Sequence, residues 1–376
     1  MSARRNPSIK NKAIQVSTFS NMHRRKFLSS TTALGVGALT LPLLRLPVLF
    51  KDVRMGVVVH SYASRWQSKV QNENYPGFLN AMDLMDHCHK IGAGGIQVVV
   101  RDWTPGFAEK LNDKREKLGM YLEGSIAVPG KEGDGKRFEA EVVSAKRAGA
   151  KILRTVTSGG RRYEVFHSAE EVQQFKKNAL NALQLAEPVL RRHKMKLAVE
   201  NHKDWRADEL VSAMKKINSE WIGVTLDFGN SIALAEDPME VIEKLVPYVF
   251  STHVKDMGVE EYANGFLLSE VPLGKGFLQL PKIFALCRQH NPSVTFNLEM
   301  ITRDPLEIPC LKDEYWSVFP GVPATDLART LRMVKQHKHK IPLPRVSHLS
   351  FEDRLEAEEK NILACFEYSR SKGGFS

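Results

Sequence analysis

Short apolar runs alternate with amphipathic segments along most of this 376-residue chain, at a spacing of roughly thirty residues. The apolar runs, each of which predicts a β-strand, are residues 54–60, 94–100, 120–128, 150–158, 196–202, 222–230, 249–256 and 293–300. The amphipathic segments, each of which predicts a helix, are residues 77–91, 105–118, 137–149, 168–194, 206–218, 238–246, 279–290 and 324–338. An eightfold strand–helix alternation predicts an α/β fold: a single-domain (β/α)8 TIM barrel over residues 51–339.

A doubly wound open sheet is the rival architecture for the same alternation. That fold needs a glycine-rich phosphate turn that follows an early strand and opens a helix. The glycines of "IGAGGIQ" (91–97) precede a strand instead. The sequence therefore favours the closed barrel.

The last four predicted strands each end in a side chain that can chelate a metal. Glu200, Asp227, His253 and Glu299 stand at these ends in succession. Because the C-terminal ends of barrel strands share one rim, the four side chains are expected to converge. Three carboxylates and one imidazole suit one divalent cation, with Mn²⁺ the first expectation and Mg²⁺, Co²⁺ or Zn²⁺ as alternatives.

The segments around these residues, in chain order, are "VENH", "LDFGN", "STHVKD" and "FNLEM". They resemble the sugar phosphate isomerase/epimerase superfamily, the xylose-isomerase-like barrels, over about residues 54–338. The resemblance is strongest from 196 to 305, and in the ketose 3-epimerase branch it carries the four metal ligands onto Glu200, Asp227, His253 and Glu299. It further implies that Glu200 and Glu299 are catalytic and transfer protons at opposite faces of a bound sugar.

A divalent cation at this site predicts proton abstraction next to a carbonyl, through a metal-stabilised enediolate. The expected function is a metal-dependent isomerase or epimerase acting on a small carbohydrate or polyol. A lyase or dehydratase acting on a keto-glycoside or an inosose is the alternative, because the same enediolate can expel a leaving group. An endonuclease-IV-like nuclease and a non-catalytic sugar-binding barrel rank lower.

The same rim carries six further candidates for binding substrate. They are His60, Trp66, His202, Lys255, Asp256 and Arg303. Three competing roles stay open: core packing for Trp66, a structural hydrogen bond for His202 and an ion pair for Lys255. The loop predicted over 257–276, with Gly265, Gly274 and Gly276, is a candidate lid.

Residues 1–50 are interpreted as a leader rather than as part of the folded domain. They contain eight basic residues and no acidic ones, so the remainder of the chain holds 46 basic against 43 acidic side chains. That near balance argues against a nucleic-acid partner. "HRRKFLSS" (23–30), followed by an apolar run, resembles a twin-arginine export signal and predicts a periplasmic or exported protein that touches the membrane only through this signal. A disordered basic tail followed by a short apolar helix is the alternative.

Residues 340–376 are expected to form a C-terminal extension, helical at about 351–368. The four cysteines are widely spaced and lack a C-x-x-C pair, which favours buried thiols over disulfides or a zinc site. The sequence leaves open whether the protein is a homo-oligomer.

Overall fold

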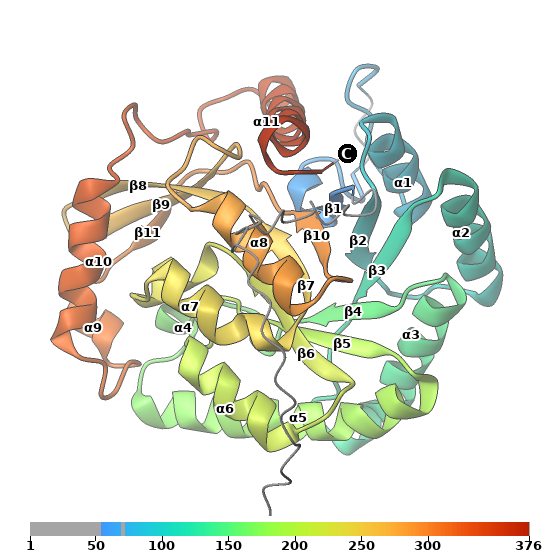
Figure 1. The fold of residues 1–376 in the computed structure, drawn as a ribbon, viewed down its shortest axis with the longest axis horizontal. Coiled ribbons are helices and arrows are strands. Elements are labelled where there is room, and N and C mark those ends of the chain that lie inside the picture. The colour runs from blue at the N-terminus through green and yellow to red at the C-terminus, as the bar shows by residue number, and fades with distance from the viewer. Residues whose placement is uncertain (1–53, 69–71, 376) are drawn as a thin grey trace, which may run out of the picture. The chain divides into compact units, whose positions relative to one another are not determined.

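The computed structural model describes residues 54–68 and 72–375 and has a closed barrel of parallel strands at its centre (Figure 1). Within those residues the barrel strands are β1 (Gly56–Val58), β2 (Gly95–Val99), β3 (Tyr121–Ser125), β4 (Ile152–Thr155), β5 (Lys196–Glu200), β6 (Ile222–Asp227), β7 (Val249–Val254) and β10 (Thr295–Leu298). Around the barrel their order is β1-β10-β7-β6-β5-β4-β3-β2. The predicted (β/α)8 barrel is confirmed, and each barrel strand lies inside a predicted apolar run.

The barrel strands are buried on both faces, as parallel strands covered by helices must be. Outward-pointing apolar side chains such as Leu197, Val199 and Leu226 join one continuous core beneath the helices. Polar side chains such as Gln97 and Glu123 interrupt the strands and are also buried. The barrel interior is thus partly polar below the rim formed by the C-terminal ends of the strands.

The helices that follow the strands begin at polar caps that the sequence supplies. Asn80, Thr104, Ser168 and Asp237 each accept a backbone hydrogen bond at the start of a helix. The helices are α1 (Ala81–Lys90), α2 (Pro105–Leu118), α3 (Gly135–Arg147), α4 (Arg162–Val165), α5 (Ala169–His193), α6 (Ala207–Ile217), α7 (Pro238–Leu245) and α8 (Leu280–His290). Short 3-10 turns are η1 (Val59–Tyr62), η2 (Glu132–Asp134), η3 (Asn230–Leu234) and η4 (Val246–Tyr248).

A small antiparallel sheet stands where the sequence predicted a loop with a lid role. β8 (Asp256–Tyr262) and β9 (Gly265–Val271) form a hairpin, and β11 (Leu306–Ile308) pairs with β9. The prediction of an irregular loop over 257–276 was therefore wrong for most of its length. Asn264 in the two-residue loop and Gly265 directly after it, at φ +150°, are turn-forming residues that mark this hairpin in the sequence.

Helix α10 (Ala324–Gln336) packs on this small sheet, and its Val334 belongs to an apolar cluster with Val259, Phe266 and Leu268. The predicted helix over 324–338 therefore exists. It was expected to be the last helix of the ring around the barrel, but it packs on the small sheet instead. A short helix, α9 (Asp313–Trp316), adds Tyr315 to the same cluster.

Helix α11 (Phe351–Lys372) closes the ring instead (Figure 1). Its Ile362, Cys365 and Phe366 are part of the main barrel core. Just beyond it, Phe375 packs edge-on against Phe296 of β10. The predicted C-terminal helix therefore packs as part of the outer helical ring of the barrel, not as an extension beyond it.

The described cysteines are all buried thiols. Among residues 54–68 and 72–375, no helix is long and apolar enough to cross a membrane. The predicted leader, residues 1–50, lies outside the described residues.

Candidate metal centre

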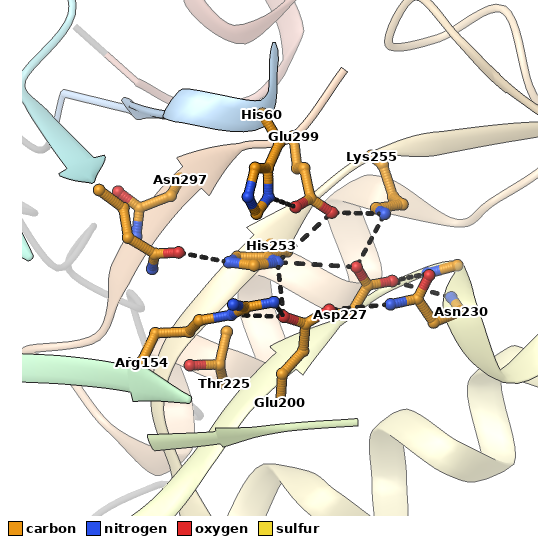
Figure 2. A network of polar contacts seen from close by, with 12 residues as sticks. His60, Arg154, Glu200, Thr225, Asp227, Asn230, His253, Lys255, Asn297 and Glu299 are labelled. Carbon is orange, nitrogen blue, oxygen red and sulfur yellow. Dashed lines mark hydrogen bonds and ion pairs between the residues drawn. The ribbon is translucent and has the colours of Figure 1, made fainter. Parts of the chain in front are cut away.

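Four chelating side chains meet at one rim of the barrel (Figure 2). Glu200 and Asp227 end β5 and β6, His253 is the last residue but one of β7, and Glu299 directly follows β10. Asp227 and His253 are paired across neighbouring strands, which sets their side chains next to each other. One candidate ligand atom from each side chain lies within 4.8 Å of those of the other three, and all four residues are buried. The structure therefore brings the predicted ligand set together.

His253 lies between the carboxylates and faces them with one ring nitrogen. Its Nδ1 is 3.5 Å from Glu200 Oε2, 3.8 Å from Asp227 Oδ2 and 3.4 Å from Glu299 Oε2. Burial lowers the pKa of His253, but Glu299 and Glu200 outweigh burial and raise this pKa to about 10. The ring thus turns Nδ1, which is buried and has no hydrogen-bond partner among the described residues, towards three carboxylate groups.

Glu200 is bound by the guanidinium of Arg154, a residue that was not predicted as part of the site. Arg154, on β4, donates from Nε to Glu200 Oε2 at 2.7 Å and also from Nη2 to the same oxygen. Asn230 donates to the other oxygen, Oε1, at 3.0 Å. Burial alone would raise the pKa of Glu200, but Arg154 and His253 hold it well below its usual range. Glu200 is therefore fixed as a carboxylate.

Asp227 is held mainly by backbone groups. Its Oδ1 accepts from the N–H groups of Gly229 at 2.9 Å and Asn230 at 2.8 Å. The Asn201 amide bonds both the backbone N–H and the backbone C=O of Asp227, at 2.7 and 2.9 Å, and so joins β5 to β6. Burial raises the pKa of Asp227, opposed by Lys255.

Glu299 has two basic neighbours. Lys255 Nζ is 2.7 Å from Glu299 Oε2, and His60 Nδ1 is 3.2 Å from Oε1. Lys255 Nζ also lies 2.8 Å from Asp227 Oδ2, so one ammonium bridges two of the carboxylates. Burial favours a raised pKa for Glu299, but His253 and Lys255 lower it well below its usual value.

The donor set fits a divalent metal ion. Three buried carboxylates crowded together are unfavourable unless cations balance them. Arg154 and Lys255 balance two of the three, and the third is left to a protonated His253 or to a bound cation that replaces its proton. Nδ1 of His253 faces the same space as the carboxylate oxygens. Oxygen donors with one imidazole suit hard and borderline divalent cations.

The predicted substrate-binding residues lie at different distances from this centre. His60 and Lys255 contact Glu299 directly. Arg303 is one step further out: its Nη2 is 2.6 Å from Glu270 Oε1, and Glu270 in turn lies 3.8 Å from Lys255 Nζ. These three residues lie on the side of the cluster where Glu299 and Glu270 stand.

The other three predicted residues are placed differently. His202 is half-buried, and burial lowers its pKa to about 3. The Asp256 carboxylate accepts backbone N–H bonds from Met257, Gly274, Gly276 and Leu278, so it anchors the turn after β9. Trp66 packs against the apolar core and pairs through its backbone with Phe78. Binding roles for these three stay predictions.

Two residues that contact the ligands from inside the barrel were not predicted from the sequence. Arg154 binds Glu200, and Gln97 Oε1 lies 2.8 Å from His253 Nε2. Each is a polar residue in the middle of an apolar run, "KILRTV" and "GGIQVVV". A lone polar residue inside a buried strand is the signal that would have found both.

Fold and centre together define a barrel with a buried carboxylate–imidazole cluster at the C-terminal rim of its strands. Residues 85–317 match the family model of the xylose isomerase-like TIM barrel, and the chain belongs to this family. A 3-oxo-isoapionate decarboxylase from Pectobacterium atrosepticum is 24% identical over 246 residues, which cover 64% of this chain and 83% of that protein.

Solved structures share the fold. A D-psicose 3-epimerase from Clostridium cellulolyticum superposes with a TM-score of 0.52 at 10% identity, covering 76% of this chain and 97% of that one. A xylose isomerase-like TIM barrel protein from Mycobacterium smegmatis, solved in complex with magnesium, gives a TM-score of 0.50 at 16% identity, covering 74% of this chain and 98% of that one.

Proposed function

We propose that this protein is a divalent-metal-dependent isomerase or epimerase that transfers a proton at a carbon next to a carbonyl group of a small carbohydrate or polyol. One observation carries the proposal: Glu200 and Glu299 lie on opposite sides of His253, each within 3.5 Å of its Nδ1 (Figure 2). Two carboxylates around one centre can serve the two faces of a bound sugar. The D-psicose 3-epimerase with the same fold supports this reading.

Glu200, Asp227, His253 and Glu299 are the residues that would hold the ion. When bound, a divalent cation would polarise the substrate carbonyl and stabilise the negative charge of an enediolate. We propose Mn²⁺ as the ion, because the set combines three oxygen donors with one nitrogen. The magnesium complex of the mycobacterial family member makes Mg²⁺ the first alternative.

Residues of the chain transfer the proton and orient the groups that transfer it. Glu299 and Glu200 take the proton from one face and return it, to the same carbon for epimerisation or to the adjacent carbon for isomerisation. Lys255 and His60 contact Glu299 and are placed to orient it and to hydrogen-bond substrate oxygens. Arg154 fixes the orientation of Glu200 through its guanidinium.

The test is proton exchange in D₂O. The purified protein, loaded with Mn²⁺ and exchanged into D₂O, is incubated with ketoses, keto-glycosides and inososes, and each substrate is read by NMR after the ion is removed. We expect deuterium at one carbon, and we expect Glu200→Gln and Glu299→Gln to lower the exchange rate by about 10²–10⁴-fold. Glu116→Gln, at an exposed position on α2, is the control. Exchange that persists in both active-site variants would exclude the proposed roles.

A lyase is the second candidate, and one contact pattern favours it. Arg154 and Lys255 place a buried cation against each glutamate, and these cations could donate further hydrogen bonds to a carboxylate of the substrate. The decarboxylase from P. atrosepticum supports this candidate. The same incubations separate the two, because a lyase or decarboxylase releases CO₂ or a second product instead of returning a labelled substrate.

A further inference from the structure

Beneath the ligand cluster, the barrel interior holds a buried relay that ends on His253. Gln97 on β2 and Glu123 on β3 are each 1% exposed. Gln97 Oε1 lies 2.8 Å from His253 Nε2, and Gln97 Nε2 donates to Glu123 Oε2 at 2.9 Å. A single amide thus connects the imidazole to a carboxylate deeper in the barrel.

Glu123 is surrounded by hydrogen-bond donors. Ser251 Oγ lies 2.7 Å from its Oε2 and Asn297 Nδ2 lies 3.1 Å from the same atom, while the Thr295 hydroxyl donates to Oε1. Burial raises the pKa of Glu123, and these hydrogen bonds together with the charge of His253 oppose that rise. Gln97, Ser251, Thr295 and Asn297 each donate to a Glu123 oxygen, so Glu123 is the acceptor in all four hydrogen bonds.

An acceptor at Glu123 fixes the direction of the Gln97 amide. Its NH₂ group must face the carboxylate, so its oxygen faces His253 and requires the Nε2–H of the ring. The opposite amide orientation would set the Gln97 oxygen against the Glu123 carboxylate oxygen. With Nε2 carrying a proton, Nδ1 is the ring nitrogen left to bind a cation among Glu200, Asp227 and Glu299.

We infer that Gln97 and Glu123 are positioning residues that hold His253 as an Nδ1 ligand with the correct tautomer and ring orientation. The inference rests on the metal site of the proposed function, but not on whether the reaction is an epimerisation or a cleavage. Partners of this kind around metal-binding histidines commonly change metal affinity by about 10- to 100-fold when removed.

A purely structural role predicts something different. Gln97→Met removes one member of a buried network and leaves Glu123 Oε2 and His253 Nε2 without this partner, so it should lower stability whatever the role of the relay. If the relay served only packing, Gln97→Met would leave the affinity for metal unchanged. If it positions His253, metal affinity falls even where the fold is intact.

The first experiment measures the affinity of the purified full chain for Mn²⁺ by calorimetry, with thermal unfolding of the metal-free protein alongside. We expect Gln97→Met to weaken Mn²⁺ binding 10- to 100-fold, at a temperature where the unfolding curve shows that the metal-free variant is folded. Thr252→Val is the control, because Thr252 neighbours His253 on the same strand but donates to the backbone of Thr295 instead of joining the relay. It is expected to keep the wild-type affinity.

Exchanging the two side chains provides the rescue. Gln97→Glu alone sets two carboxylates against each other, and Glu123→Gln alone removes the group that orients the amide, so each single variant should bind Mn²⁺ more weakly. The double variant again offers an acceptor to His253 and a donor between the two positions, and it should recover most of the affinity. The tautomer is read directly by ¹⁵N NMR of histidine-labelled protein loaded with diamagnetic Zn²⁺, where the wild type should show Nε2–H.

Each outcome decides the matter. Wild-type Mn²⁺ affinity in Gln97→Met, no recovery in the double variant, or an Nδ1–H tautomer in the loaded protein would overturn this inference alone. A wild-type protein that binds no divalent ion would overturn it together with the proposed function.

Discussion

Arg154 and Glu200 form a buried ion pair at the inner edge of the candidate centre. The guanidinium Nε lies 2.7 Å from Glu200 Oε2, and both side chains are at most 9% exposed. Their strands, β4 and β5, are hydrogen-bonded neighbours, so the pair spans one step of the barrel wall. The cation thus orients a predicted metal ligand and compensates its charge.

Removing the cation should therefore destabilise the protein markedly. We expect Arg154→Met to lower the free energy of unfolding by about 3–5 kcal/mol, because it leaves a carboxylate buried without its partner. Urea unfolding of the metal-free protein measures this. Arg137→Met, which removes an exposed pair with Glu141 on α3, is the matched control and should cost less than about 1 kcal/mol. Equal losses in the two variants would contradict the role given to Arg154.

Divalent metal should stabilise the fold through the same cluster. At a free Mn²⁺ concentration 100 times its dissociation constant, the expected gain is about 2.7 kcal/mol in the free energy of unfolding. Thermal unfolding with increasing Mn²⁺, and again with a chelator, measures the gain. Asp227→Asn and His253→Ala should abolish it, and a stabilisation by Mn²⁺ that survives both changes would place the ion elsewhere.

Glu358 on α11 should make stability depend on pH. Burial, only partly offset by the Ser64 N–H, raises the pKa of Glu358 from 4.5 to about 7. Because the folded-state pKa is the higher one, the folded protein holds this proton while the unfolded chain releases it. The resulting cost is absent below about pH 4.5, grows as the pH rises towards 7 and is complete above that value.

Glu358→Gln should therefore stabilise the protein at pH 8 by about 2–3 kcal/mol and leave it unchanged near pH 4.5. Denaturant unfolding at both pH values tests the difference. Glu356→Gln, also on α11 but paired with Lys360 at the surface, should show no such pH dependence. A gain of equal size at the two pH values would argue against titration of Glu358 as the cause.

Export through the twin-arginine route stays a proposal about residues 1–50. Lysine does not reproduce the planar guanidinium, so Arg24→Lys with Arg25→Lys should retain the protein in the cytoplasm. Fractionation of bacterial cells that express the full chain measures this. A second arginine pair, Arg4 and Arg5, offers a control within the same leader. Unchanged export in the Arg24/Arg25 variant would refute the signal.

The sequence predicted the barrel and the convergence of Glu200, Asp227, His253 and Glu299 because both depend on local patterns. An apolar run that ends in a polar residue marks a strand and its rim within a few residues. The four ends then meet because the fold is closed, which requires no knowledge of individual contacts.

The hydrogen-bond relay below the rim, from Glu123 through Gln97 to His253, could not be predicted from local sequence patterns. Gln97 meets His253 across 156 positions of sequence, and nothing local to either residue indicates the other. Only the pairing order of the strands sets them face to face. For the same reason, the amphipathic patterns of α10 and α11 predicted helices but did not say which sheet each one covers.

Helix α11 also joins the last part of the barrel to the first. Glu358 accepts from the Ser64 N–H at 2.9 Å, and Glu359 pairs with Arg65, directly after the η1 turn that carries His60. During synthesis, His60 is made long before α11. The contacts near it become complete only when Glu358 and Glu359 have been synthesised. The support of His60 is thus complete only after α11 has been made, and a nascent chain cut short before α11 would carry all four chelating residues without the contacts of Glu358 and Glu359 near their histidine neighbour.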